Sequence, residues 1–281
     1  MTFSTHGQRR TSIRLALAPA VVLAISLGAA VVLFNPAAAA TDSAPAASLD
    51  AGIARYRSQL TADIDRSVTE VQKLRASLAS GDVAAAKQAW IEARVGWERS
   101  EVFTSGFAPE LDRAIDAWPN GASGFHAIEA KLFGAGRTDV TDEVDALLHS
   151  LADMAATARK TDLTPQGLLD GLTRLAYEVG ESKVDGGESR ISGTSIDDMR
   201  NNVDGIETAY GTIFAAAIDR SDHDLGANAR RLIDELKSML AQRDLRQLDQ
   251  ERLRALSEEL VLTLQTVAPK LALARPTLEL Q

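Results

Sequence analysis

The sequence predicts an all-α protein built as a helical bundle. Apolar residues recur every three or four positions from Leu49 onward, the period of one helix face, and no stretch alternates as a strand would. The composition is 45% hydrophobic with only 5% aromatic residues, which is typical of closely packed helices. A core of about 230 residues suits two four-helix bundles packed together, over 49–160 and 161–281, although no clear repeat relates the halves.

Residues 1–40 are predicted to direct export. Arg9, Arg10 and Arg14 precede an uncharged apolar run over 15–34, and Ala38-Ala39-Ala40 offers a cleavage site for signal-peptide removal. A run of about 20 apolar residues could instead stay uncleaved and anchor the chain in a membrane. Both alternatives place the remaining domain outside the cytoplasm, in the periplasm or elsewhere in the cell envelope.

Charge and cysteine content exclude several classes of function. The chain has 39 Asp and Glu against 30 Lys and Arg, a formal charge of -9, and without residues 1–40 the balance becomes 27 against 39, or -12. Such an acidic domain argues against nucleic-acid binding, which needs clustered basic residues. The absence of cysteine excludes disulfides, thiolate metal sites, a cysteine nucleophile and lipid attachment through cysteine. Any metal must therefore be held by oxygen and imidazole nitrogen.

The first helices are separated by clear stop and start signals. The composition of residues 41–48 predicts a short flexible linker, after which Leu49 begins the first apolar stripe. Gly81 ends this helix, and Asp82 is a good N-cap for the next one, which continues to about residue 103. Prolines and glycines then predict a loop, a short helix and a tight turn before another helix begins near Ser123.

The helical period continues through the rest of the chain. Thr164-Pro165 marks one helix start, because proline at the first helical position has no amide hydrogen to lose. Trp90 and Trp97, seven residues apart in the second helix, are expected to be core aromatics. The further helices are expected at about 139–159, 164–182, 195–219, 223–242 and 247–273.

Two pairs of potential metal ligands are spaced three residues apart on predicted helices. His126 and Glu129 would share a helix face and could bind one cation together. Glu98 and Glu101 repeat this spacing, with Arg94 one turn before Glu98. Spacing alone leaves two other interpretations open, an incidental surface pair for the first and a solvated charged face for the second.

Four segments occur together in a fixed order, and the order is more informative than any one of them. The segments are Gly81–Lys87 continuing to Trp97-Glu98-Arg99-Ser100-Glu101, then Leu111–Asp116, then Gly124-Phe125-His126-Ala127-Ile128-Glu129, and finally Glu178-Val179, Lys183-Val184 and Asn202-Val203-Asp204-Gly205. Together they resemble the imelysin-like proteins, including the EfeO and EfeM type of periplasmic iron-uptake protein, over most of the chain after residue 40. The third segment matches that family's Gly-x-His-x-x-Glu signature.

The resemblance implies one metal site. Its ligands would be His126, Glu129, Glu98, Glu101, Asp116 and Glu178. Several carboxylates in one cleft repel each other, whereas a bound cation stabilises all of them in ionised form. Hard oxygen ligands with one imidazole suit iron, and also zinc, manganese or calcium, so ligand type alone does not choose the metal.

The sequence also departs from the family pattern. Where the family reads Tyr-Ser-His-Thr-Asp-Leu, this chain has Ile191-Ser192-Gly193-Thr194-Ser195-Ile196, without the histidine and the aspartate. Only a few residues separate the export segment from the first helix, so the chain is expected to be the short form that lacks the N-terminal cupredoxin domain.

The leading hypothesis is an exported binding protein that captures iron and presents it to a membrane uptake partner. The resemblance implies a membrane iron permease and an associated exported peroxidase-type protein as partners. One alternative is a zinc-dependent metallopeptidase, but a zincin helix needs two histidines four apart, and the other histidines of the domain are only His149 and His223. Another is a structural surface bundle with a degenerate metal site, because the histidine and aspartate near residue 193 are missing.

Overall fold

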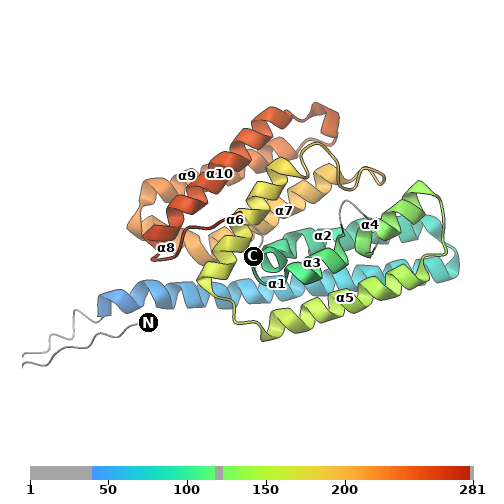
Figure 1. Cartoon of the computed structure of the whole chain (residues 1–281), viewed down its shortest axis with the longest axis horizontal. Coiled ribbons are helices and arrows are strands. Elements are labelled where there is room, and N and C mark those ends of the chain that lie inside the picture. The colour runs from blue at the N-terminus through green and yellow to red at the C-terminus, as the bar shows by residue number, and fades with distance from the viewer. Residues whose placement is uncertain (1–39, 118–122, 279–281) are drawn as a thin grey trace, which may run out of the picture.

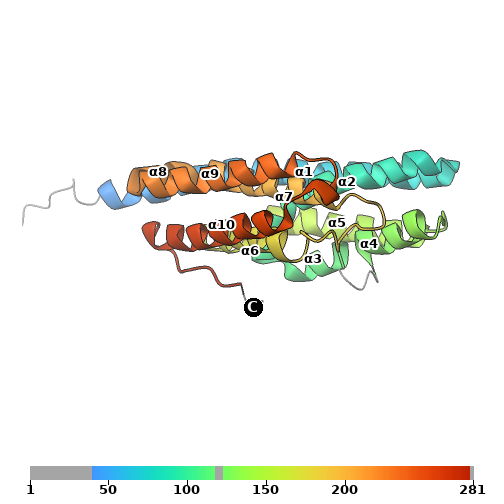
Figure 2. The ribbon, with the colours of Figure 1, turned by 90° about the horizontal axis from the view of Figure 1, so that it is seen from above.

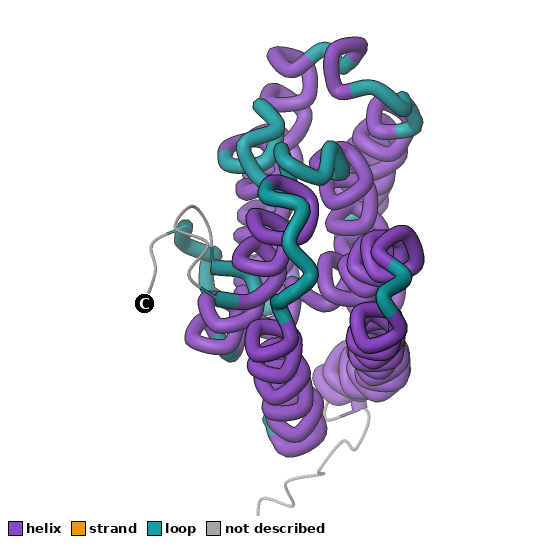
Figure 3. The backbone as a smooth tube through the Cα atoms, turned by 90° about the vertical axis from the view of Figure 1, so that its right-hand side faces the viewer, coloured by secondary structure: helices purple, strands orange, loops and turns teal. Residues whose placement is uncertain are grey.

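The computed structural model describes residues 40–117 and 123–278, and these residues form an all-α bundle, as predicted (Figure 1). Within these ranges the chain contains no strand (Figure 3). The export segment predicted over 1–40 lies, apart from Ala40, outside the described residues. The helices are α1 Ala40–Ser80, α2 Val83–Phe107, α3 Pro109–Ile115, α4 Gly124–Glu129, α5 Thr141–Lys160, α6 Pro165–Glu181, α7 Ser195–Ala209, α8 Ala215–Ser221, α9 His223–Leu240 and α10 Gln250–Lys270.

The helix starts follow the capping signals in the sequence. The Asp82 side chain accepts a hydrogen bond from the Ala85 amide at 2.9 Å at the start of α2. Thr164 does the same for the Gly167 amide at the start of α6, with Pro165 as the first helical residue. Both predicted starts are confirmed, because side-chain oxygens replace backbone acceptors that the first turn lacks.

The start of one helix and the continuity of another differ from the prediction. Helix α1 begins at Ala40, so residues 41–48 are helical and do not form the predicted flexible linker. Alanine has the highest helix propensity, and extending an existing helix avoids the nucleation step, so an alanine-rich segment continues α1 toward its N-terminus. The helix expected over 195–219 is interrupted by a wider π-helical turn, Tyr210–Phe214, between α7 and α8.

The helices form two groups that meet along α2. In the first group α1 packs against α2 and α5, while in the second α6 and α9 each contact both α7 and α10. Helix α2 also contacts α6 and α7, so it belongs to the interior of the molecule. Seen from above, α1, α8 and α9 lie in one layer and α5, α6 and α10 in another (Figure 2).

Glycines allow the close approach of α2 to its neighbours. A side chain at Gly171 of α6 would overlap the Val102 carbonyl oxygen, and one at Gly205 of α7 would lie 2.6 Å from the Arg99 carbonyl oxygen. The buried apolar side chains form one continuous core that includes Tyr56 from α1 and Leu264 from α10. The two predicted halves therefore share a core. None of the helices in the described ranges is long and apolar enough to span a membrane.

Candidate metal centre

Helix α2 contributes three charged side chains to the interior. Arg94, Glu98 and Glu101 are separated by four and three residues, so they lie on one helix face. Their exposed fractions are 1%, 0% and 4%, which excludes the solvated charged face that the spacing had left open. Groups of this kind are almost never fully buried unless they are paired.

A close contact between α3 and α4 brings His126 beside Asp116. Gly124 has a φ of +67°, and a side chain there would overlap the Ile115 carbonyl oxygen, so only glycine fits. Helix α4 can therefore begin directly against the C-terminal end of α3, where Asp116 is the capping residue. His126 Nε2 then lies 3.2 Å from Asp116 Oδ1, and His126 Nδ1 lies 3.0 Å from Glu129 Oε2.

Two tryptophans fix this arrangement. Trp97 Nε1 donates a hydrogen bond to Asp116 Oδ2 at 2.9 Å, and Trp90 Nε1 donates to the Phe125 carbonyl oxygen at 3.1 Å. Both indole rings are fully buried, so the prediction that they are core aromatics is confirmed. Their N–H groups also hold α4 and Asp116 in place.

The second half of the chain supplies hydrogen-bond donors to the carboxylates of the first half. Residues 182–194, the α6–α7 segment, carry Lys183, Glu188 and Ser192. Ser192 donates hydrogen bonds from its amide and its hydroxyl to Glu129 Oε1 at 2.8 and 2.7 Å. From α7, Asn202 Nδ2 donates to Glu98 Oε2 at 2.8 Å and to Glu101 Oε2.

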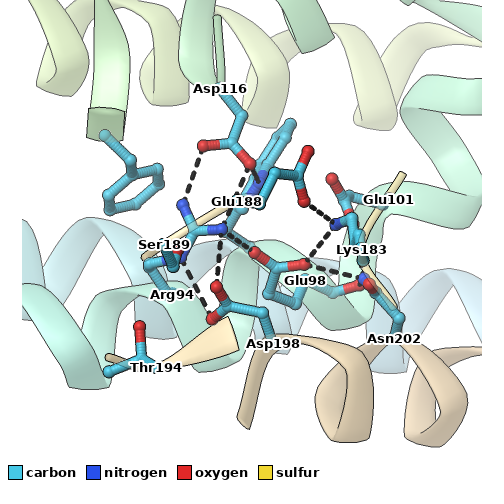
Figure 4. Close-up of polar contacts among 12 residues, drawn as sticks. Arg94, Glu98, Glu101, Asp116, Lys183, Glu188, Ser189, Thr194, Asp198 and Asn202 are labelled. Carbon is cyan, nitrogen blue, oxygen red and sulfur yellow. Dashed lines mark hydrogen bonds and ion pairs between the residues drawn. The ribbon is translucent and has the colours of Figure 1, made fainter. Parts of the chain in front are cut away.

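Two internal cations lie among the carboxylates (Figure 4). The Arg94 guanidinium contacts Glu98, Asp116 at 2.7 Å and Asp198 at 3.1 Å. The Lys183 ammonium contacts Glu98 at 2.8 Å, Glu101 at 3.0 Å and Glu188 at 3.3 Å. Glu98 is the carboxylate that both cations share, one on each of its oxygens.

Two of these carboxyl groups, Glu98 and Asp116, have pKa values below their usual range. Burial opposes this, but Arg94 and then Lys183 outweigh it and lower the pKa of Glu98. Burial likewise opposes the lowering at Asp116, where Arg94 and His126 hold the pKa below its usual range. The pKa of His126 is raised although burial opposes this, because the Asp116 charge and the hydrogen bond that the ring donates to Glu129 outweigh the effect of burial.

The remaining carboxyl groups are harder to ionise. Burial, followed by repulsion from Glu98, raises the pKa of Glu101 well above its usual value. Burial also raises the pKa of Asp112 to about 6, of Glu178 to about 7 and of Asp198 to about 7. The cluster therefore contains more carboxyl groups than its two internal cations can neutralise. A bound cation would favour the ionised forms and release protons.

The geometry brings five of the six predicted ligands together. Glu98, Glu101 and Asp116 each offer an oxygen within 4.8 Å of the others, a spacing that can enclose one cation. His126 adjoins this group through Asp116, and Glu129 adjoins His126. The sixth, Glu178, lies on α6 at the edge of the cluster, where Asp112 and Lys183 act on it electrostatically. Whether these side chains bind a metal stays a prediction.

Besides Arg94, four further buried residues of the cluster were absent from the predicted ligand set. They are Lys183, Glu188, Asp198 and Asn202. Asp198 and Asn202 are four residues apart on α7 and interrupt its apolar stripe, which is the sequence signal that could have revealed them. Glu188 lies in the irregular α6–α7 segment, where no helical period marks a buried position.

A comparison with protein-family models matches the part of the chain that forms this cluster. The imelysin family model matches residues 52–123 and 120–271. The chain belongs to the imelysin family. The matched ranges include every residue of the cluster described above. The family model carries a peptidase-type name.

Two relatives of this imelysin-family chain are named as EfeM or EfeO proteins. It is 28% identical over 209 residues to an EfeM/EfeO family lipoprotein of Staphylococcus haemolyticus, which covers 69% of this chain and 71% of the relative. It is also 28% identical over 211 residues to the iron uptake system component EfeM of Pseudomonas syringae, covering 72% of each.

A solved structure shares the fold. The putative iron-regulated protein A precursor of Parabacteroides distasonis superposes with a TM-score of 0.59, covering 77% of this chain and 91% of that one. The sequences are 19% identical, so this likeness concerns the arrangement of helices alone.

Proposed function

We propose that this protein is an exported iron-binding protein that captures iron and delivers it to a membrane uptake system. The observation that carries the proposal is the convergence of Glu98, Glu101 and Asp116, with His126 at 3.2 Å from Asp116. Oxygen ligands with one imidazole suit iron in either common oxidation state. The name of the relative from Pseudomonas syringae, an iron uptake system component, supports iron as the cargo.

The arrangement suits a carrier. The ligands come from α2, the end of α3 and α4, so a cation would be bound by side chains from separate helices of the bundle. The surplus of acidic residues, with a formal charge of -9, raises the local concentration of cations around the protein.

The proposed location is the cell envelope. Residues 1–40 would direct export, and an uncleaved run over 15–34 would keep the protein at the membrane. The Staphylococcus relatives are named lipoproteins, whereas this sequence has no cysteine to carry a thioether-linked lipid. The proposed partners are a membrane iron permease and an exported peroxidase-type protein.

A metallopeptidase is the other outcome that an experiment must distinguish. Among the described residues, His149 is 81% exposed in its side chain and His223 is an exposed residue at the start of α9. Neither lies beside His126, so the described cluster offers a single imidazole where a zincin uses two. This observation favours binding over hydrolysis.

Calorimetric titration of the purified protein with Fe²⁺, Fe³⁺, Zn²⁺, Mn²⁺ and Ca²⁺, beside a peptidase assay on the same samples, tests the proposal. We expect stoichiometric binding of iron that Asp116→Asn weakens at least tenfold. Asp145→Asn is the matched control, because Asp145 forms an exposed pair with Arg75 away from the cluster. Peptide hydrolysis that depends on added zinc would contradict the proposal, as would the absence of any iron binding.

A further inference from the structure

Lys183 is a buried lysine whose ammonium lies among three carboxylates of the cluster. Its side chain is 3% exposed, and its ammonium lies 2.8 Å from Glu98 Oε2 and 3.0 Å from Glu101 Oε2. These are two of the three carboxylates that converge on one point. A third contact, at 3.3 Å, joins the ammonium to Glu188 on the same α6–α7 segment. Figure 4 shows Lys183 between Glu98, Glu101 and Glu188.

A metal ion bound by Glu98 and Glu101 would compete with this ammonium for the same two carboxylates. A bound metal ion needs ligand oxygens at roughly 2.0–2.6 Å. Glu98 and Glu101 would then face two cations at once in a buried space, where like charges repel strongly because little water screens them. Either the ammonium moves away or the metal does not enter.

The two internal cations differ in how firmly they are held. Arg94 contacts carboxylates on three separate elements and lies over the rings of Trp90 and Phe125, with centroid distances of 5.4 and 5.3 Å. Lys183 lies just beyond the end of α6 and carries its charge on a long stem with several rotatable bonds. One of its three partners, Glu188, is on the same segment and can stay paired with it as it withdraws.

We propose that Lys183 is an internal counter-cation, which occupies the cation position of the metal-free protein and is displaced when a metal binds. The inference rests on the proposed function and adds a residue that sets the affinity. In the metal-free state the ammonium stabilises the buried carboxylates. During release the ammonium returns to Glu98 and Glu101. Its competition lowers the affinity for iron, so that the bound ion can dissociate to a partner.

The first test compares iron affinities of charge-removing variants at pH 7.5. Lys183→Met keeps the length of the side chain and removes the competing charge, so we expect iron to bind at least tenfold more tightly than to wild type. Lys237→Met is the matched control, because Lys237 also contacts two carboxylates, Asp204 and Glu207, but on the outer side of α7 and α9. This control should change the affinity less than twofold.

The second test follows the position of the ammonium itself. An amine-acylating reagent should leave Lys183 unmodified in the metal-free protein, because the side chain is buried. On loading with iron, mass spectrometry should show modification of Lys183 at least fivefold faster, while Lys237 reacts equally in both states. This readout separates displacement from simple repulsion by a nearby charge that stays in place.

If Lys183→Met alone does not fold, a double variant that leaves the net charge unchanged can be used instead. Lys183→Met/Glu188→Gln removes one charge of each sign and should show the same gain in affinity. If wild type binds iron but neither variant gains affinity, or if Lys183 stays unreactive in the loaded protein, the inference is wrong and the proposed function stands. If wild type binds no metal, both fail.

Discussion

His126 is contacted on both ring nitrogens, and this decides how it can take part in binding. Asp116 lies at 3.2 Å from Nε2 and Glu129 at 3.0 Å from Nδ1, and these acids raise the pKa of the ring although burial acts in the opposite direction. The imidazolium form therefore persists to higher pH than in an ordinary histidine. A metal binds only the neutral ring, so binding at His126 must release a proton and should strengthen as pH rises.

The first prediction concerns this ring. His126→Ala should weaken iron binding by about tenfold to a hundredfold and leave the helical content unchanged. Glu129→Gln should act in the same direction, because it removes an ionic partner while keeping the volume. His149→Ala is the control, since His149 is an exposed residue of α5. Titration calorimetry and circular dichroism measure both properties, and unchanged affinity in His126→Ala would exclude His126 as a ligand.

The second prediction concerns the pH dependence of stability at Glu178. Burial, followed by Asp112, raises the pKa of its carboxyl to about 7 in the folded protein, from a usual value of 4.5. The folded state therefore binds more protons than the unfolded state between these values, so this group lowers the stability as pH rises through that window. Above pH 7 its destabilising effect is complete.

Glu178→Gln removes that effect at every pH. In urea unfolding of the metal-free protein, the variant should match wild type near pH 4 and exceed it at pH 8 by on the order of 1–2 kcal/mol, discounted for partial burial. Glu181→Gln, on the exposed side of the same helix, provides the control. A stability difference that stays constant between pH 4 and pH 8 would show that Glu178 ionises normally.

At the scale of elements, the junction between α3 and α4 is the feature on which the cluster depends most. The third prediction compares two glycines with positive φ. Gly124→Ala places a methyl group against the Ile115 carbonyl oxygen, whereas Gly136→Ala meets nothing within 4 Å. The φ values are similar, +67° and +64°, so the backbone strain is shared and the difference reports the close contact.

Gly124→Ala should therefore lower the free energy of unfolding by about 3 kcal/mol or more and weaken iron binding as His126 moves from Asp116. Gly136→Ala should lower it by only about 1 kcal/mol and leave binding unchanged. Chemical unfolding and calorimetry on both variants measure these effects. Equal losses in the two variants would mean that α4 does not need its close approach to α3.

Helical elements were predictable where local chemistry decides them. Asp82 and Thr164 cap their helices through contacts within one turn, so the sequence is enough to place them. The start of α1 was missed, because alanine-rich segments suit both a linker and a helix. At the position where the resemblance led us to expect a histidine, Gly193 has a φ of +79°, a backbone conformation that favours glycine.

The positions of most residues of the cluster were also predictable from the sequence, whereas the burial of its two cations was not. Helical spacing and family resemblance together predicted six ligands, and five of them, His126, Glu129, Glu98, Glu101 and Asp116, lie together, whereas Glu178 lies at the edge of the cluster. Neither indicated that Arg94 and Lys183 would be buried among them. The charged residues of a helix such as α2 have the same spacing whether they face water or the core, and Lys183 lies beyond the end of α6, where no helical period marks a buried position. Tertiary packing of α2 against α6 and α7 decides which of these occurs.

At the scale of the whole molecule, the cluster joins the two groups of helices. Lys183 and Asn202 contact Glu98, Asp198 contacts Arg94, and Ser192 contacts Glu129 across the predicted division near residue 160. The apolar core is continuous across the same boundary. Because both polar and apolar contacts cross it, neither half can lose its structure without exposing buried groups of the other.

The last prediction is that the protein unfolds in one cooperative transition and that iron shifts this transition as a whole. At a free iron concentration of 100 times the dissociation constant, binding should add about 2.7 kcal/mol, which raises Tm by roughly 5–10 °C for a domain of this size. Differential scanning calorimetry should give equal calorimetric and van't Hoff enthalpies with and without iron. Two separate transitions, or an iron shift confined to one of them, would instead show that 49–160 and 161–281 are independent bundles. The bridging contacts at Glu98 and Arg94 argue for the single transition, because each side chain has ion-pair partners in both halves.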